Sequence, residues 1–176
     1  MIKNVSISMH RVSRSMTIVR GLALAVLAFF TFAAPASAQQ RIVRIQQEAT
    51  LRFLDAHEIK ERDFQVVTRP FQNDNTQLWV LTDMGGGLHT IMQVSSGRFL
   101  DAHEIGSLDF RVVTRLRQNN NTQLWRLNNF GGGFHTIQQA SNNRFLDAYG
   151  SQARDFSAVT RPATGSSAQS WRIVSP

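Results

Sequence analysis

A repeat with a period of 46 residues constrains this chain of 176 residues more strongly than any other feature. The segment Arg-Phe-Leu-Asp-Ala occurs three times, at residues 52–56, 98–102 and 144–148. An Asp-Phe pair, a Val-Thr-Arg triplet and a Gln-x-Trp motif follow each copy at the same spacing. Residues 39–176 divide into three such units, 39–84, 85–130 and 131–176. Repetition of this kind predicts one domain built from three copies of a single structural unit.

Each unit contains about four short strand signals separated by polar or glycine-rich turns. In the second unit these signals lie at residues 89–94, 98–102, 110–115 and 123–127. The glycine triplets at 85–87 and 131–133 lie between units, where tight turns require positive φ. Residues 39–176 show no sustained apolar period of 3.6 residues. The sequence therefore predicts an all-β domain of about twelve short strands.

Three equal units restrict how such strands close into a domain. A propeller usually has at least four blades, and a solenoid requires distinct polar caps. Pseudo-threefold closure favours a β-trefoil, with a three-sheet β-prism as the alternative. A large aromatic side chain at a threefold position fills the interior of a trefoil, so we expect the tryptophans to anchor the core. The residues predicted as core are Trp79, Trp125, Trp171, Phe53, Phe99, Phe145, Leu54, Leu100 and Leu146.

Residues 1–38 have the features of a secretory signal peptide. Basic residues come first, no acidic residue precedes Glu48, and an apolar run at 21–34 is followed by Ala36-Ser37-Ala38. An uncleaved membrane anchor is the alternative, but the run is shorter than the roughly 20 residues that span a bilayer. We therefore expect cleavage before Gln39, a secreted or periplasmic protein, and no membrane span after cleavage.

Removal of this leader changes the charge balance. The whole chain has 19 Lys and Arg against 12 Asp and Glu, a formal net charge of +7. The leader holds 4 of the basic residues and none of the acidic ones, which leaves a net charge of +3. The remaining basic residues are scattered singly and form no run that follows a phosphate backbone, so we expect no nucleic-acid partner. The chain has no cysteine, which excludes disulfides and cysteine-ligated metals.

The Gln-x-Trp motif near the end of each unit, with a Leu-Asp earlier in the unit, resembles the repeat of ricin-B-type lectins. The resemblance covers residues 39–176 and implies a β-trefoil with one shallow sugar site per unit. It implies that the aspartate accepts hydrogen bonds from sugar hydroxyls and that an Asn-Gln pair before the tryptophan adds polar contacts. Carboxylates and amides suit these roles. The matching positions are Asp55, Asp101 and Asp147, with Gln77, Gln123 and Gln169.

The sequence departs from the lectin pattern at two positions of each unit. The asparagine of the pair is replaced by Thr76, Thr122 and Ala168. The aromatic residue that stacks on the sugar is replaced by Val67, Val113 and Val159. A residue two places after each aspartate lies on the same face of the strand and is the candidate substitute for stacking. These residues are His57, His103 and Tyr149.

The third unit is expected to bind glycans least well. It has Ala168 and Ser170 where the first two units have Thr and Leu, and Tyr149-Gly150 where they have His-Glu. Its loop at 163–168 also lacks the asparagines of the other two loops.

Structural roles compete with ligand binding at several of these positions. The glutamines can satisfy buried backbone groups, and the aspartates can pair with a neighbouring arginine or cap a turn. If an aspartate instead lies at a surface site, its replacement should weaken binding and leave stability nearly unchanged. A second set of residues is predicted to form ion pairs: Arg69, Arg115 and Arg161 with Asp63, Asp109 and Asp155.

No motif in the chain indicates catalysis. His57-Glu58 and His103-Glu104 are adjacent pairs, so in a strand their side chains point to opposite faces. The sequence contains no HExxH, no Gly-x-Ser-x-Gly and no phosphate-binding glycine loop before a helix. His89 and His135 occupy equivalent places that threefold geometry keeps apart. We therefore expect no catalytic site, no metal and no cofactor.

These observations together predict a secreted, lectin-like module with up to three weak sites for glycans or polysaccharides. The alternative is a protein-binding trefoil of the inhibitor or adhesin type, with degenerate sugar sites and a separate protein partner. In that case the fold is a scaffold and the working residues lie in the loops at 71–75 and 116–121.

Overall fold

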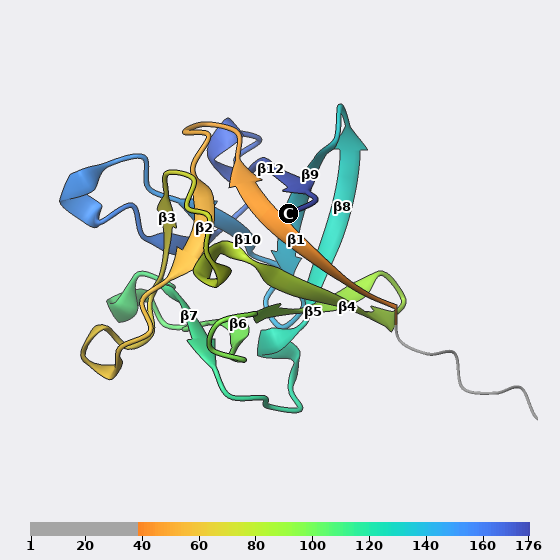
Figure 1. Ribbon diagram of the computed structural model, residues 1–176, viewed down its shortest axis with the longest axis horizontal. Coiled ribbons are helices and arrows are strands. Elements are labelled where there is room, and N and C mark those ends of the chain that lie inside the picture. The colour runs from red at the N-terminus through yellow and green to blue at the C-terminus, as the bar shows by residue number, and fades with distance from the viewer. Residues whose placement is uncertain (1–38) are drawn as a thin grey trace, which may run out of the picture. The chain divides into compact units, whose positions relative to one another are not determined.

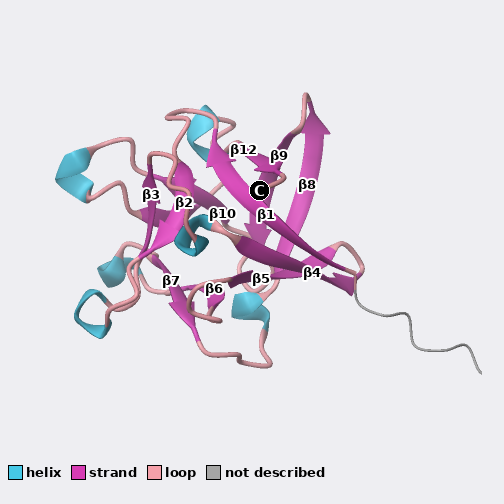
Figure 2. Ribbon diagram, viewed as in Figure 1, coloured by secondary structure: helices cyan, strands magenta, loops and turns pink. Residues whose placement is uncertain are grey.

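The computed structural model describes residues 39–176, which form an all-β domain of twelve strands joined by short 3-10 turns (Figures 1 and 2). The strands are β1 Gln40–Gln47, β2 Phe53–Ala56, β3 Val66–Arg69, β4 Trp79–Gly85, β5 Leu88–Gln93, β6 Phe99–Ala102, β7 Val112–Arg115, β8 Trp125–Gly131, β9 Phe134–Gln139, β10 Phe145–Ala148, β11 Ala158–Arg161 and β12 Trp171–Val174. The 3-10 turns are η1 Lys60–Arg62, η2 Asn75–Gln77, η3 Gly106–Leu108, η4 Asn121–Gln123, η5 Gln152–Arg154 and η6 Ser167–Gln169. The predicted signal peptide, residues 1–38, lies outside the described residues.

Six strands close into an antiparallel barrel. β1 pairs with β4 and β12, β5 pairs with β4 and β8, and β9 pairs with β8 and β12. Each strand of this ring therefore has a partner on both sides, which removes the exposed edges of an open sheet.

The other six strands form three hairpins that pack around the pseudo-threefold axis. The pairs are β2–β3, β6–β7 and β10–β11. The backbone N–H groups of Thr68, Thr114 and Thr160 each donate a hydrogen bond of 2.9 Å to a carbonyl of a neighbouring repeat. A barrel with three such hairpins is a β-trefoil, so the fold prediction is confirmed and the β-prism alternative is wrong.

The three tryptophans of the Gln-x-Trp motifs anchor the core, as predicted. Trp79, Trp125 and Trp171 are each 0% exposed. Each indole Nε1–H donates a hydrogen bond of 3.0 Å to the carbonyl of the leucine in its own Leu-Asp segment. One interaction therefore ties the end of each repeat to its second strand. The fully buried partners around them include Leu54, Leu100, Leu146, Ile45, Ile91 and Ile137.

The predicted core role of the three phenylalanines before these leucines is wrong. Phe53, Phe99 and Phe145 are only partly buried, whereas the adjacent leucines are fully buried. Successive side chains of a strand point to opposite faces, so a phenylalanine next to an inward leucine must point outward. In the first two repeats its ring contacts a residue of the loop that follows the third strand.

Neighbouring repeats are joined by arginines that stack on phenylalanines. The guanidinium carbons of Arg52, Arg98 and Arg144 lie 3.6, 3.7 and 3.6 Å from the ring centroids of Phe156, Phe64 and Phe110. Each phenylalanine belongs to an Asp-Phe pair in the left-handed region, with φ between 49° and 55°. This unusual turn carries the ring outward to the next repeat, and the cation–π contacts offset part of its conformational cost.

Candidate functional site

Two shallow hollows open beside the predicted aspartates of the first and second repeats. Their volumes are about 320 and 300 Å³. Most residues that line one hollow have an equivalent in the other, 46 residues further along the chain. The corresponding pairs are Asp55 and Asp101, His57 and His103, Glu58 and Glu104, Arg69 and Arg115, Gln72 and Gln118, and Thr76 and Thr122. The repeat therefore builds the same polar depression twice.

The two aspartates lie deep in these hollows. Asp55 and Asp101 are 2% and 5% exposed, so they do not stand on the open surface. One carboxylate oxygen of each accepts the backbone N–H of the next alanine, at 2.7 and 2.8 Å. The other oxygen accepts the side-chain amide of Gln77 at 3.4 Å or of Gln123 at 3.1 Å. These carboxylates are therefore not surface groups with few contacts, because each one satisfies buried donors.

Burial raises the pKa of Asp55 above its ordinary value, although the Ala56 N–H and the charge of Arg69 lower it. The Arg69 Nε lies 3.7 Å from the carboxylate of Asp55. Burial likewise raises the pKa of Asp147 in the third repeat, against the hydrogen bond from Gln169 and the charge of Arg161. A carboxylate kept partly desolvated in a depression is a recurrent feature of ligand sites.

The glutamines of the Gln-x-Trp motifs have a structural role, as the alternative interpretation held. Gln77 is 0% exposed. Its Nε2 donates to the Pro70 carbonyl and its Oε1 accepts the Gln72 N–H, both at 2.8 Å. Gln123 and Gln169 make the same pair of contacts in their own loops, at 2.8 to 2.9 Å. Each glutamine thus fixes the loop that borders its aspartate.

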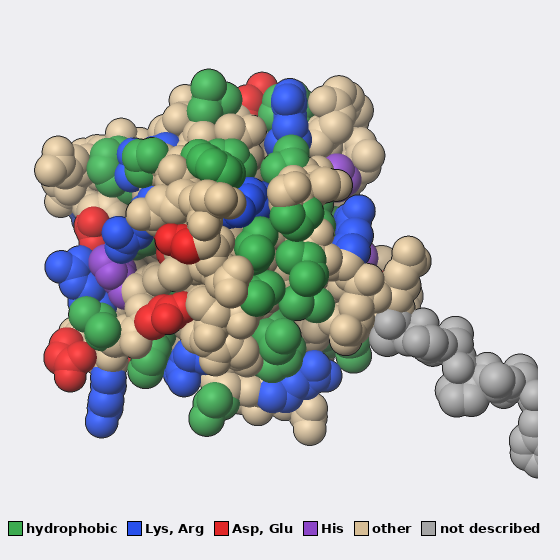
Figure 3. Space-filling model, viewed as in Figure 1, with side chains coloured by type: hydrophobic (Ala, Val, Ile, Leu, Met, Phe, Trp, Pro, Cys, Tyr) green, Lys and Arg blue, Asp and Glu red, His purple; other side chains and the backbone are tan. Residues whose placement is uncertain are grey.

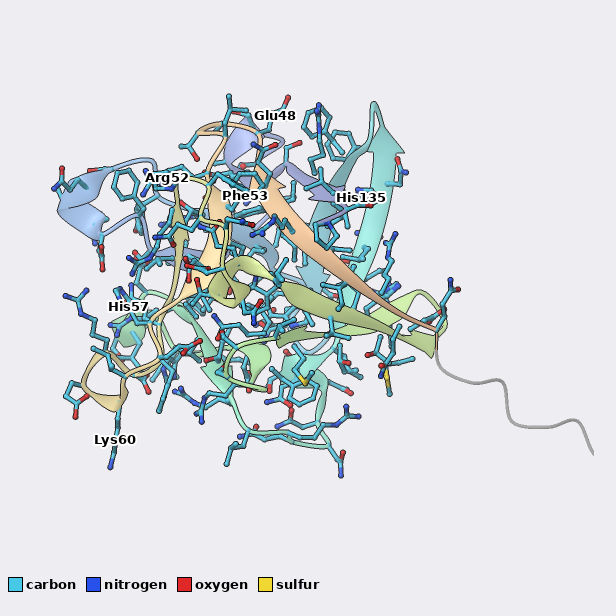
Figure 4. The ribbon with its side chains drawn as sticks, in the orientation of Figure 1. Glu48, Arg52, Phe53, His57, Lys60 and His135 are labelled. Atoms are coloured by element: carbon cyan, nitrogen blue, oxygen red, sulfur yellow. The ribbon has the colours of Figure 1, made fainter. Side chains whose placement is uncertain are left out.

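The residues predicted as stacking partners bridge neighbouring repeats. His57 Nε2 lies 2.9 Å from a carboxylate oxygen of Asp155, and His103 Nε2 lies 2.6 Å from Asp63. The Tyr149 hydroxyl donates to Asp109 at 2.6 Å. Figure 4 shows His57 at the edge of the domain, away from the barrel. Both histidines still line the hollows of their own repeats, so each borders its aspartate as predicted.

The predicted arginine–aspartate ion pairs form in two of three places. Arg115 pairs with Asp63 at 2.8 Å, and Arg161 lies 3.9 Å from Asp109. In the first repeat Arg62 reaches Asp155 instead, at 2.8 Å. These pairs therefore cross the junctions between repeats.

Sequence reasoning missed three further features of the surface. Glu58 and Glu104 line the hollows and accept hydrogen bonds from Ser95 and Ser141. Gln72 and Gln118 also line them. Their repetition in register was the available signal. A third hollow of about 490 Å³ lies beside the last loop, at 163–170, where the repeat is least well kept.

Among residues 39–176, no group of three or more His, Cys, Asp or Glu side chains is arranged to hold a metal ion. Within the same range no helix is long and apolar enough to cross a membrane. Figure 3 shows Lys and Arg side chains spread around the visible face and not gathered into one patch.

Comparison with protein families finds one match. The model of the family described as ricin-type beta-trefoil lectin domain-like matches residues 75–160. The resemblance to ricin-B-type lectin repeats is therefore confirmed over the part of the chain from the first Gln-x-Trp motif to the third hairpin. No curated protein matches the sequence.

Solved structures share the fold at low sequence identity. ThreeFoil, a designed 3-fold symmetric protein, is 21% identical with a TM-score of 0.70, over 77% of this chain and 99% of that one. The structure titled SeviL bound to asialo-GM1 saccharide is 16% identical with a TM-score of 0.60, over 79% and 98%. An exo-beta-1,3-galactanase from Clostridium thermocellum is 21% identical with a TM-score of 0.69, and the match covers 82% of this chain but only 31% of the enzyme. These likenesses establish the β-trefoil fold.

Proposed function

We propose that this ricin-type β-trefoil is a non-enzymatic carbohydrate-binding module that binds glycans in the hollows of its first two repeats. The observation that carries the proposal is the duplication of one polar lining in two places. These residues repeat around an open depression, where they are accessible to a ligand. The family match at 75–160 includes the second of these hollows.

The chemistry of the hollows suits sugar hydroxyls. The carboxylates of Asp55 and Asp101 lie deep in the two hollows and accept strong, charge-assisted hydrogen bonds. The side chains of Gln72 and Gln118 supply both donors and acceptors at the edges. The buried glutamines Gln77, Gln123 and Gln169 act as positioning residues behind the sites.

The two sites lie beside two hairpins of one domain, and this sets the mode of binding. Each hollow is shallow, and no Phe, Tyr or Trp side chain lines it to stack on a sugar ring. Each site alone is therefore expected to be weak. Two sites that engage one polysaccharide or glycan-coated surface raise the overall affinity by avidity. The third repeat, with Tyr149, Gly150 and Ala168 in place of His, Glu and Thr, contributes least.

A glycan array with the purified protein tests the proposal. We expect binding to a defined set of glycans that is lost in the double variant Asp55→Asn/Asp101→Asn. The control Glu61→Gln removes one exposed carboxylate outside the hollows and is expected to bind normally. Failure of the parent protein to bind any glycan, or unchanged binding by the double variant, would contradict the proposal.

Export is part of the proposal. The apolar run at 21–34 and the Ala36-Ser37-Ala38 signal support cleavage before Gln39 and a secreted or periplasmic product. Intact-mass measurement of the exported protein is expected to give a chain that starts at Gln39. A product that retains residues 21–34 would instead make this a membrane-anchored protein.

Protein binding is the second candidate function. The loops expected to carry it expose large apolar side chains, Phe71 at 59% and Leu116 at 69%. Loops carry binding residues in many proteins, and these side chains are accessible to a partner. Competition with free sugar separates the two candidates. Excess sugar should abolish binding through the hollows and leave binding through these loops unchanged.

A further inference from the structure

The third hollow, of about 490 Å³, differs from the other two in place and in lining. It lies between the β8–β9 hairpin and the loop at 163–170, and its walls are mainly apolar. Phe130 and Phe145 supply two aromatic rings, and Phe130 is 58% exposed. Of the residues assigned to glycan binding only Gln169 borders it, and both ends of its amide group bond the loop backbone.

The internal symmetry shows what normally covers this position. In the first repeat the Phe71 ring packs edge-on against Phe53, with centroids 5.7 Å apart, and the Arg44 guanidinium lies 4.9 Å from the Phe71 centroid. In the second repeat the Arg117 guanidinium lies 5.1 Å from the centroid of Phe99. The outward phenylalanine is thus covered once by a ring with a cation and once by a cation alone.

The third repeat lacks both covering groups. The residue equivalent to Phe71 and Arg117 is Ala163, and the residue equivalent to Arg44 is Thr136. Neither side chain reaches across Phe145, and both line the hollow. The ring is therefore left open to a group from outside the chain.

A second replacement deepens the hollow. Ser170 stands where the other repeats have Leu78 and Leu124. Ser170 is 4% exposed and lines the hollow, and its hydroxyl finds no hydrogen-bond partner among residues 39–176. The serine side chain is shorter than the leucine that it replaces, so this wall of the hollow is set back.

The charge at the rim is negative. Glu48 lines the hollow and follows β1, whose neighbour in the barrel is the last strand (Figure 4). The equivalent residues of the other repeats are Val94 and Ala140. No Lys or Arg lines the hollow, and none of the ion pairs within residues 39–176 involves Glu48.

We propose that this hollow is a binding site for a small aromatic cation, separate from the glycan sites. The ligand's ring packs on Phe145 as Phe71 packs on Phe53, and its cationic group points toward Glu48 at the rim. Glu48 pairs with the cation, and the short side chain of Ser170 leaves room for the ligand. The volume is within the usual range for small-molecule sites, about 300 to 1,000 Å³.

Titration calorimetry with benzamidine tests the site, with benzamide as its neutral isostere and benzoate as its anionic counterpart. We expect saturable binding of one benzamidine per chain. The affinity for benzamide is expected to be about two- to fivefold lower, the value of one exposed ion pair. Benzoate is expected not to bind. Equal affinity for benzamidine and benzamide, or no binding of benzamidine, would overturn the proposal.

Variants locate the binding. Ala163→Phe restores the side chain of the first repeat at an exposed position and should abolish benzamidine binding while leaving the fold intact. Ser170→Leu fills the hollow from another wall and should also abolish benzamidine binding. Thermal melting checks that this variant is folded. Glu48→Gln should weaken benzamidine about two- to fivefold and leave benzamide unchanged, whereas Glu61→Gln should change neither. Normal benzamidine binding by a folded Ala163→Phe protein would show that the ligand binds elsewhere.

Discussion

The second and third repeats share an interior and differ in their exterior. Trp125 and Trp171 are equally buried and donate the same hydrogen bond of 3.0 Å to equivalent leucine carbonyls. Outside, the second repeat has His103 and Arg117 where the third has Tyr149 and Ala163. The replacement of His103 by Tyr149 alters the contact with a neighbouring repeat. The replacement of Arg117 by Ala163 removes the cation that covers the outward phenylalanine.

This difference shows which positions the closed barrel constrains. An inward residue must fit against its two symmetry equivalents, so a change in one repeat disturbs all three. A loop residue contacts mainly its own hairpin and solvent, so each repeat is free to change its loops. Divergence among the loops, with the core kept, is what allows one fold to hold two kinds of site.

The largest expected effect tests the shared interior. Trp125→Ala and Trp171→Ala should each lower the free energy of unfolding by about 3–5 kcal/mol, because each removes a fully buried aromatic side chain. Denaturant unfolding of the two variants measures this. Costs that differ strongly between the variants would mean that the repeats do not share an equivalent core.

Glycan binding should separate the exteriors of the same two repeats. Asp101→Asn removes the charge of a site carboxylate and is expected to weaken binding at least about tenfold, the usual effect of losing a charge-assisted hydrogen bond. Asp147→Asn should leave binding within about twofold, because the third repeat lacks the matching lining. Titration of both variants with a glycan identified on the array gives the comparison. A larger loss for Asp147→Asn would reverse the assigned ranking.

The junctions between repeats should show smaller effects. Tyr149→Phe removes the hydrogen bond of 2.6 Å from the hydroxyl to Asp109 and keeps the ring. We expect a loss of about 0.5–1.5 kcal/mol in the free energy of unfolding. Asp109→Asn alone and the double variant complete a double-mutant cycle. A coupling energy near zero would mean that this contact adds nothing to the junction.

The smallest expected effect is the pH dependence of the junction that precedes the second repeat. Burial raises the pKa of Asp63, but the hydrogen bond from His103 and the charge of Arg115 outweigh it, so the pKa is lowered overall. A lowered folded pKa stabilises the protein above the unfolded value of about 3.9, and this contribution is lost as the pH falls through the folded pKa. Because Asp63 is half-exposed, we expect Asp63→Asn to cost less than about 1 kcal/mol at neutral pH and nothing at strongly acidic pH.

Asp55 provides a control of opposite sign. Because its pKa is raised, Asp55 keeps its proton to a higher pH in the folded protein than in the unfolded chain. The stability that Asp55 contributes therefore falls as the pH rises above about 3.9, the unfolded pKa. Asp55→Asn should therefore gain stability relative to the parent as the pH rises over that range. Denaturant unfolding over a range of pH measures both effects. If the stabilities of Asp63→Asn and Asp55→Asn relative to the parent change with pH in the same direction, these assignments are contradicted.

The sequence predicted the trefoil because three copies of one motif at equal spacing leave few ways to close a sheet. It predicted the tryptophan core for the same reason. The outward direction of Phe53, Phe99 and Phe145 was missed, because an apolar pair such as Phe-Leu does not show which member faces inward. The hollow beside Ala163 was also missed, because it arises from side chains that are absent, and their absence matters only once the neighbours are known.

The number of glycan sites per chain tests the central claim most directly. Titration calorimetry with a monovalent glycan identified on the array should give two sites of similar affinity, one site in either Asp55→Asn or Asp101→Asn, and none in the double variant. These variants keep the oxygen that accepts the backbone N–H, so they should fold. A stoichiometry of two that persists in the double variant, or one that falls only with Asp147→Asn, would contradict the account.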